Sequence, residues 1–205
     1  MKRFFAIGLL LIGASVMAAG QTSEREGAHA QAACRMTLAQ APAVGGLKLG
    51  MTPEQTLSLF PGSRDDGEVR VSLSRPATQF GESTLIVRPQ KYATKARFPG
   101  VEQISFKMLD GRIYTFQVGY EGMQWKHVDD FVTKFTQGRN LPPASAWEAY
   151  VGMDTQLKTL KCKEFEISVF AGGKNVNVNY VQLIDKEAER KLKERKAKAR
   201  EMRGN

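Results

Sequence analysis

The dipeptide Asp110-Gly111 constrains the fold more than any other feature, because it separates two segments in which apolar and polar residues alternate. The segments are Val101–Leu109 and Arg112–Val118. An Asp-Gly pair suits the backbone angles of a two-residue turn between antiparallel strands. The sequence therefore predicts a β-hairpin near the middle of the chain.

Other segments with alternating or β-branched residues predict that this hairpin belongs to a larger antiparallel sheet. Gly172-Gly173 is expected to turn the last hairpin of that sheet. The additional predicted strands are Glu68–Arg75, Ser83–Val87, Ala146–Val151, Leu157–Cys162, Phe165–Ala171 and Asn175–Leu183.

Two helices are predicted to lie on the sheet. The first begins within the stretch Gly46–Gly62, where Thr52 is the expected N-cap, Pro53 occupies the first helical position and Gln55 completes a capping box. The second is predicted from apolar residues spaced at i, i+3, i+4 and i+7, which are Val128, Phe131, Val132 and Phe135. The order of helix then strands occurs twice. It predicts an α+β fold with two similar units, whose helices share one face of an antiparallel sheet.

The last segment, Asp185–Asn205, differs in composition, with nine Lys or Arg and five Asp or Glu residues. Its Glu and Lys residues recur at i, i+4 spacing, which favours a charged helix. A solvated helix is the simplest expectation. The alternative is a tether to an anionic membrane or wall surface, because each basic residue near such a surface is worth about 1 kcal/mol.

The N-terminus has the pattern of a secretory signal peptide, with Lys2 and Arg3 before an apolar segment and small residues after it. An uncleaved membrane anchor is the alternative. The expected location is exported, either periplasmic or secreted. The predicted organisation is a signal peptide at 1–20, a flexible linker at 21–45, one α+β domain at 46–184 and a charged helical tail at 185–205.

The chain has two cysteines, Cys34 in the predicted linker and Cys162 in the predicted domain. In an exported protein they are expected to form one disulfide bond, and two unpaired buried thiols are the alternative. No metal site is predicted, because the sequence has no C-x-x-C motif and only two histidines, His29 and His127.

No catalytic constellation is found in the sequence, and no cofactor is predicted. His127 is the only histidine of the predicted domain, and we expect it to be exposed on a helix surface. Neither a G-x-S-x-G nucleophile motif nor a phosphate-binding glycine loop occurs in the chain. The chain is therefore expected not to be an enzyme.

The candidate binding surface is a basic loop in which four cations surround Tyr92; the cations are Arg88, Lys91, Lys95 and Arg97. An aromatic ring can stack on a partner while cations steer that partner into place. A solvated loop without a binding role is the alternative. The net charge of +9 favours anionic partners, and export argues against nucleic acid.

The stretch Leu47–Gly62 resembles the helix opening of exported domains with the β-lactamase-inhibitor-protein-like fold. That group includes the small lipoprotein of the outer-membrane barrel-assembly machinery. Thr56 occupies a position where the group usually has an aliphatic residue, and Cys34 is not placed as a lipidated cysteine would be. The resemblance implies a domain that binds another protein through its sheet face or its loops. The matching residues are Gly50, Met51, Thr52, Gln55 and Phe60.

These observations predict a non-enzymatic protein-binding or assembly module of the cell envelope. Its expected partner is another envelope protein or an anionic surface. Membrane contact through the tail or an uncleaved signal stays open, as does the oligomeric state. The alternatives are a hydrolase or inhibitor-type protein with its site in residues 88–97, and a structural wall component held by charge.

Overall fold

A computed structural model of the protein describes residues 34–122, 125–152, 155–172 and 178–204. The chain divides into two units, Met1–Ala30 and Gln31–Asn205, and all described residues belong to the second. The predicted signal peptide, the first part of the predicted linker and Gly173 of the predicted turn lie outside the described residues.

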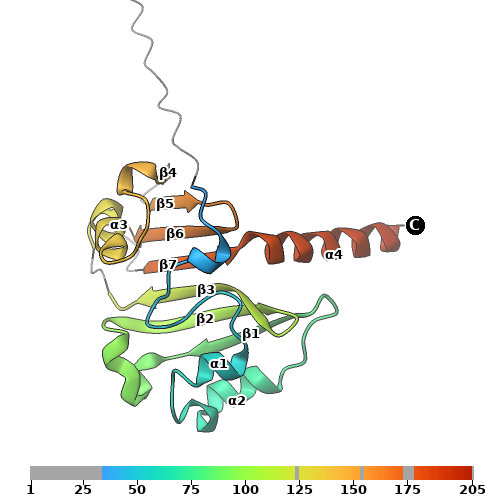
Figure 1. The fold of residues 1–205 in the computed structure, drawn as a ribbon. Coiled ribbons are helices and arrows are strands. Elements are labelled where there is room, and N and C mark those ends of the chain that lie inside the picture. The colour runs from blue at the N-terminus through green and yellow to red at the C-terminus, as the bar shows by residue number, and fades with distance from the viewer. Residues whose placement is uncertain (1–33, 123–124, 153–154, 173–177, 205) are drawn as a thin grey trace, which may run out of the picture. The chain divides into compact units, whose positions relative to one another are not determined.

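Seven strands within the described residues form one antiparallel sheet, which confirms the predicted α+β fold class (Figure 1). Their order is β1-β2-β3-β7-β6-β5-β4, so two meanders of consecutive strands meet where β3 pairs with β7. The predicted hairpin joins β2 to β3, and its turn residues Asp110 and Gly111 have φ angles of 51° and 75°. The strands are β1 (Glu82–Val87), β2 (Val101–Leu109), β3 (Arg112–Tyr120), β4 (Glu148–Gly152), β5 (Thr155–Lys161), β6 (Phe165–Gly172) and β7 (Asn179–Asp185).

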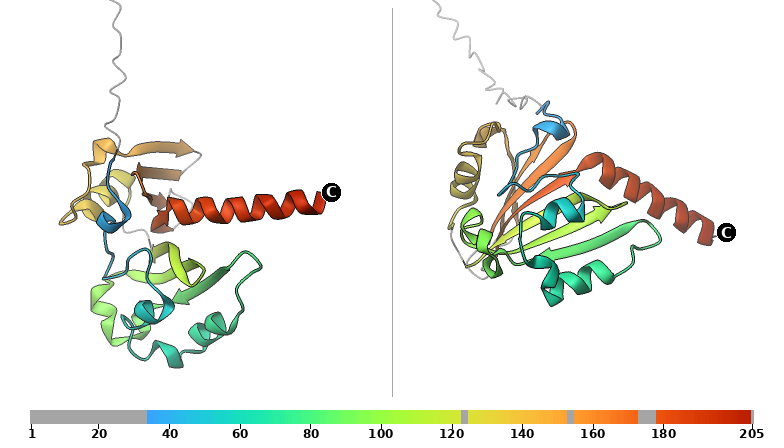
Figure 2. Two further views of the ribbon diagram at one scale, coloured as in Figure 1. Left: turned by 45° about the vertical axis from the view of Figure 1, so that its right-hand side comes forward. Right: turned by 60° about the horizontal axis from the view of Figure 1, so that its bottom comes forward.

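Helices α1, α2 and α3 pack on the same face of the sheet, and their apolar side chains share one core with it (Figure 2). A fourth helix, α4, follows the last strand. The α-helices are α1 (Pro53–Leu57), α2 (Gly67–Ser74), α3 (Val128–Thr136) and α4 (Lys186–Gly204). Short 3-10 helices are η1 (Leu38–Gln40), η2 (Ser63–Asp65), η3 (Pro89–Lys91), η4 (Ala93–Arg97) and η5 (Ala144–Ala146).

The core lies between these three helices and the sheet. Phe116 of β3 and Leu183 of β7 are opposite each other in the register, and both are fully buried. Phe60, after α1, and Phe131, in α3, close the core from the helix side. Burying a side chain of this kind is worth about 1.5–3 kcal/mol, so apolar burial is the main force that holds the helices on the sheet.

The segment Glu68–Arg75 was predicted as a strand, and this prediction is wrong because the segment belongs to helix α2. The carboxylate of Asp66 accepts hydrogen bonds from the N–H groups of Glu68 (2.9 Å) and Val69 (3.4 Å), which caps the helix. Val69 is buried, whereas Val71 is 52% exposed. The alternating apolar residues therefore do not form the buried face of a strand, and the local cap decides the structure.

Helix α4 confirms the predicted tail helix and attaches to the β2–β3 hairpin. Leu192 is 5% exposed and packs with Leu109 and Tyr114 in a small apolar cluster separate from the main core. Arg195 donates to both carboxylate oxygens of Asp110, at 2.9 and 2.7 Å. None of the helices in the described residues has the length and apolar character needed to cross a membrane.

Cys34 and Cys162 form the predicted disulfide bond, with 2.01 Å between their Sγ atoms. The bond fixes the first described residue to Cys162, the residue that follows β5. Residues 34–45, which belong to the predicted linker, contact the domain: Val44 is 5% exposed, and the N–H of Leu38 donates to the Glu164 carboxylate at 2.8 Å. The disulfide indicates an oxidising, extracytoplasmic compartment.

Replacing both cysteines by alanine (Cys34→Ala with Cys162→Ala) is expected to lower the free energy of unfolding by roughly 3–5 kcal/mol. The bond joins residues separated by 128 positions, so its loss releases a long loop in the unfolded chain. Urea unfolding followed by circular dichroism measures the difference. Wild-type protein unfolded in reducing buffer is the matched control and should lose the same amount. An unchanged urea midpoint in the double variant would contradict the prediction.

Candidate functional site

The predicted basic loop, residues 88–97, folds into the 3-10 helices η3 and η4 between β1 and β2. Tyr92, its aromatic residue, is 9% exposed and packs in the core, with its ring centroid 6.0 Å from that of Phe60. Burial raises the pKa of the Tyr92 hydroxyl above its usual value. Tyr92 therefore supports the fold and is not presented to a partner.

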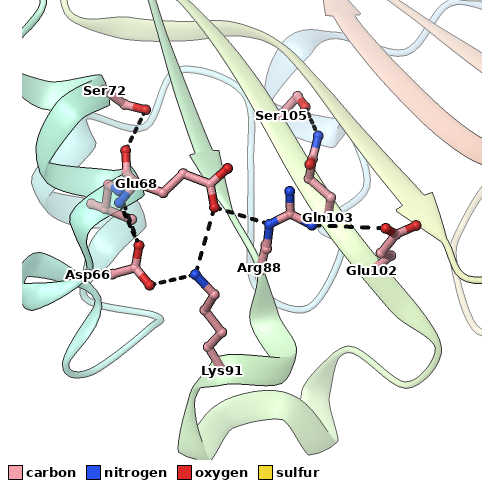
Figure 3. Close-up of polar contacts among 9 residues, drawn as sticks. Asp66, Glu68, Ser72, Arg88, Lys91, Glu102, Gln103 and Ser105 are labelled. Carbon is pink, nitrogen blue, oxygen red and sulfur yellow. Dashed lines mark hydrogen bonds and ion pairs between the residues drawn. The ribbon is translucent and has the colours of Figure 1, made fainter.

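Arg88 and Lys91 form ion pairs with residues at the start of α2 (Figure 3). The Nε of Arg88 donates to the Glu68 carboxylate at 3.1 Å, and the Nζ of Lys91 donates to Asp66 at 2.8 Å. The hydrogen bond from Lys91 holds the pKa of Asp66 below its usual value, and the hydrogen bond to Glu68 raises the pKa of Arg88. These contacts pair two of the four predicted cations and connect η3 to α2.

The other two predicted cations, Lys95 and Arg97, are exposed in η4. Arg97 lies at the rim of a cleft that separates residues 97–101 from helix α3. The structure therefore directs Arg88 and Lys91 toward α2, whereas Arg97 lines the cleft. The five residues predicted as one binding surface therefore do not lie together on one surface. Arg88 and Lys91 contact α2, Tyr92 is buried in the core, and Lys95 and Arg97 are exposed in η4.

The sheet face opposite α1–α3 carries a row of apolar side chains, hereafter the aromatic row. The register aligns one residue from each of four neighbouring strands, which are Tyr150, Leu157, Phe170 and Tyr180. Their chain neighbours Val169 and Val181 are buried in the core, so the row faces away from the helices. Tyr150 is 65% exposed, and the Phe170 and Tyr180 rings stack with centroids 5.0 Å apart.

A row of uncharged polar side chains, hereafter the polar row, runs beside the aromatic row. The hydroxyls of Thr159 and Ser168 are 3.2 Å apart, and the Gln103 amide donates to Ser105 at 3.0 Å (Figure 3). At the β4 end of this row, Glu148 forms an ion pair with Lys161 of β5. In register order the polar row consists of Thr159, Ser168, Gln182, Gln117 and Ser105.

The aromatic row is not among the residues predicted from the sequence. One signal was present in Phe165–Gly172, where Phe170 stands between two small apolar residues that face the core. A strand with apolar residues on both faces indicates that its second face is also covered or available for contact. The cross-strand alignment with Tyr150 and Tyr180 depends on the register, which spacing along the chain does not give.

Among the described residues, no three His, Cys, Asp or Glu side chains lie together in a way that could hold a metal ion. His127 is the N-cap residue of α3 and is exposed, and its side chain makes no capping hydrogen bond. This position agrees with the exposed helix site predicted for it.

Comparison of the chain with protein-family models, with curated proteins and with solved structures finds no match in any of the three. The resemblance of the Leu47–Gly62 stretch to β-lactamase-inhibitor-protein-like domains therefore stays a prediction. The candidate surfaces rest on their own geometry.

Asp66 is expected to stabilise the domain both as the N-cap of α2 and as the partner of Lys91. Asp66→Ala should lower the free energy of unfolding at neutral pH by about 1–2 kcal/mol, and Asp66→Asn, which can still cap, should lose less. The folded-state pKa is lowered, so the stabilisation from the charge is present above about pH 4 and is lost as the pH falls through that pKa. Urea unfolding at neutral and acidic pH measures both effects.

The comparison of the two Asp66 variants separates the cap from the ion pair. Wild type and Asp66→Asn should converge in stability at acidic pH, while Asp66→Ala should stay less stable than Asp66→Asn. Equal losses for the two variants at neutral pH would show that Asp66 has no capping role.

Proposed function

We propose that the protein is an exported, non-enzymatic binding module of the cell envelope that holds another protein on the open face of its sheet. The observation that carries this proposal is the aromatic row, which lies on the face opposite α1–α3. Tyr150 is its most exposed member, at 65%. The adjoining polar row adds neutral hydrogen-bonding groups to this apolar contact area.

The chemistry of this face suits a protein better than a charged polymer or a lipid headgroup. The centres of protein interfaces are enriched in aromatic residues and depleted of charge, while polar and charged groups occupy the rim. The aromatic and polar rows are uncharged, and the ion pair between Glu148 and Lys161 lies at their margin. Stacked or partly buried aromatic residues are also the usual energetic anchors of such interfaces.

Strand β4 offers a second means of holding a partner. It lies at one end of the strand order and pairs with β5 alone among the described strands. The outer side of an edge strand presents backbone N–H and C=O groups to which a strand of a partner can pair. Because Tyr150 is in the middle of β4, a strand added there would lie next to the aromatic row.

Two further observations support a role outside the cytoplasm. The N-terminal sequence has the pattern of a signal peptide. The bond between Cys34 and Cys162 suits the oxidising conditions of that compartment. The net charge of +9 favours association with an acidic partner.

The two alternative functions have less support from the observed contacts. A hydrolase or inhibitor site in residues 88–97 would rely on Arg88 and Lys91, which are engaged with acidic residues near the start of α2. A charge-held wall component would rely on the basic tail. Several cations of that tail already form ion pairs within the protein, namely Arg190, Lys191, Lys193, Arg195 and Lys196.

Site-specific photo-cross-linking in the native cell envelope tests the proposal. A photoreactive phenylalanine derivative at Tyr150 is expected to give one discrete adduct with a different protein, because this side chain stands at the exposed end of the aromatic row. The adduct should be lost when Leu157→Lys places a charge in the same row. Mass spectrometry of the adduct identifies the second chain.

The same photoreactive residue at Val71 is the matched control. Val71 is 52% exposed on α2, within the helix layer and away from the aromatic row. Absence of an adduct at position 150, the same adducts at both positions, or an adduct with a second copy of this chain would each overturn the proposal.

A further inference from the structure

A cleft of about 410 Å³ opens on the helix side of the sheet, between residues 97–101 and helix α3. Val44 and Gly45 line it from the N-terminal segment, and Tyr120 lines it from the end of β3. A volume in this range is typical of sites for small organic molecules. The cleft lies on the opposite face from the aromatic row, so it is independent of the proposed partner-binding surface.

Aromatic rings form much of the wall of the cleft. The rings of Trp125 and Phe131 are nearly parallel, with a 3° angle between their planes and 3.7 Å between their centroids. Tyr120 meets both rings edge-on, at centroid distances of 5.1 and 5.4 Å. Across the cleft, Phe98 is held by stacking on Phe60, with centroids 5.1 Å apart. The wall is thus apolar and is fixed by contacts between the rings themselves.

Three cations, Arg97, Lys134 and Arg139, also line the cleft, whereas its described lining includes no Asp or Glu. The guanidinium of Arg139 lies over the Phe135 ring, 4.6 Å from its centroid, and its Nη1 donates to the Phe135 carbonyl at 2.6 Å. Its Nε has no hydrogen-bond partner among the described residues. This Nε is buried, so the fold leaves one buried donor of Arg139 unused beside the cleft.

We infer that this cleft binds small aromatic carboxylates. The ring wall would contact a flat apolar body, while the planar guanidinium groups of Arg97 and Arg139 match the two oxygens of a carboxylate. A neutral aromatic molecule would bring no counter-charge to the three cations, and a cationic molecule would be repelled by all of them.

The positive charge already acts on the interior of the cleft. Burial raises the pKa of the Tyr120 hydroxyl, and the charge of Arg139 partly offsets this effect. An anion placed beside Tyr120 would lie in the same positive potential. Because Tyr120 and Arg139 are partly shielded from water, a charge contact beside them is stronger than at an open surface.

Proton–nitrogen correlation NMR of the purified protein tests the inference, because it resolves the indole N–H signals of its two tryptophans. Trp125 lines the cleft, whereas Trp147 is 2% exposed and is not among the lining residues. Titration with naphthoate is expected to shift the Trp125 signal and leave the Trp147 signal in place. Naphthyl methanol, the neutral analogue, should bind at least about tenfold more weakly.

Charge variants locate the site of binding. Arg97→Gln and Lys134→Gln alter exposed side chains and should each weaken naphthoate binding by about threefold or more. Lys95→Gln, in the same 3-10 helix as Arg97 but outside the cleft, is the matched control and should leave binding unchanged. Arg139 is not substituted, because its guanidinium also donates a hydrogen bond to the Phe135 carbonyl and its loss would alter the fold.

Several results would overturn the inference. These are no shift of the Trp125 signal, an equal shift of the Trp147 signal, and equal affinities for naphthoate and naphthyl methanol. An equal loss of binding in Lys95→Gln and Arg97→Gln would show a general charge effect. Tighter binding of naphthyl phosphate than of naphthoate would show that the cleft recognises a phosphate and not a carboxylate.

Discussion

The pairing of β3 with β7 holds the two halves of the domain in one sheet, and the other features of the structure depend on it. Each half consists of helices followed by a meander of strands, and each is small for burying a core of its own. The pairing removes two exposed strand edges and aligns apolar residues from both halves. The aligned and fully buried pairs are Phe116 with Leu183 and Val118 with Val181.

The same pairing decides which surfaces stay open. Strand β7 continues directly into α4, whose N-terminus is capped by the last residue of the strand. The carboxylate of Asp185 accepts hydrogen bonds from the N–H groups of Glu187 and Ala188, each at 3.0 Å. Helix α4 then packs against Tyr114 and the β2–β3 hairpin. It lies at the hairpin end of the sheet, and the aromatic row lies toward the opposite ends of the central strands. The fold therefore gives its charged tail a structural role.

Most features that depend on residues close in the chain could be predicted from the sequence, whereas contacts between distant residues, apart from the Cys34–Cys162 disulfide, could not. The Asp110-Gly111 turn and the capping box at Thr52 are present as predicted. The strand prediction for Glu68–Arg75 was wrong because the alternating apolar residues of this segment follow the N-cap Asp66 and form helix α2. The basic loop contacts α2 because Lys91 bonds Asp66, 25 positions earlier in the chain. The cleft collects residues from several separate segments of the chain, among them those that contain Val44, Arg97, Tyr120 and Arg139.

Asn179 lies between the two proposed binding surfaces. It is fully buried, and its amide accepts from the N–H of Gly172 at 3.2 Å and donates to the carbonyl of Gly122 at 2.6 Å. In the register it is opposite Tyr120, which lines the cleft, and it precedes Tyr180 of the aromatic row. A buried amide with its hydrogen bonds satisfied fixes the backbone around it. These hydrogen bonds hold β3 and β7 in place between the two surfaces: the cleft reaches Tyr120 of β3 on one face of the sheet, and the aromatic row begins at Tyr180 of β7 on the other.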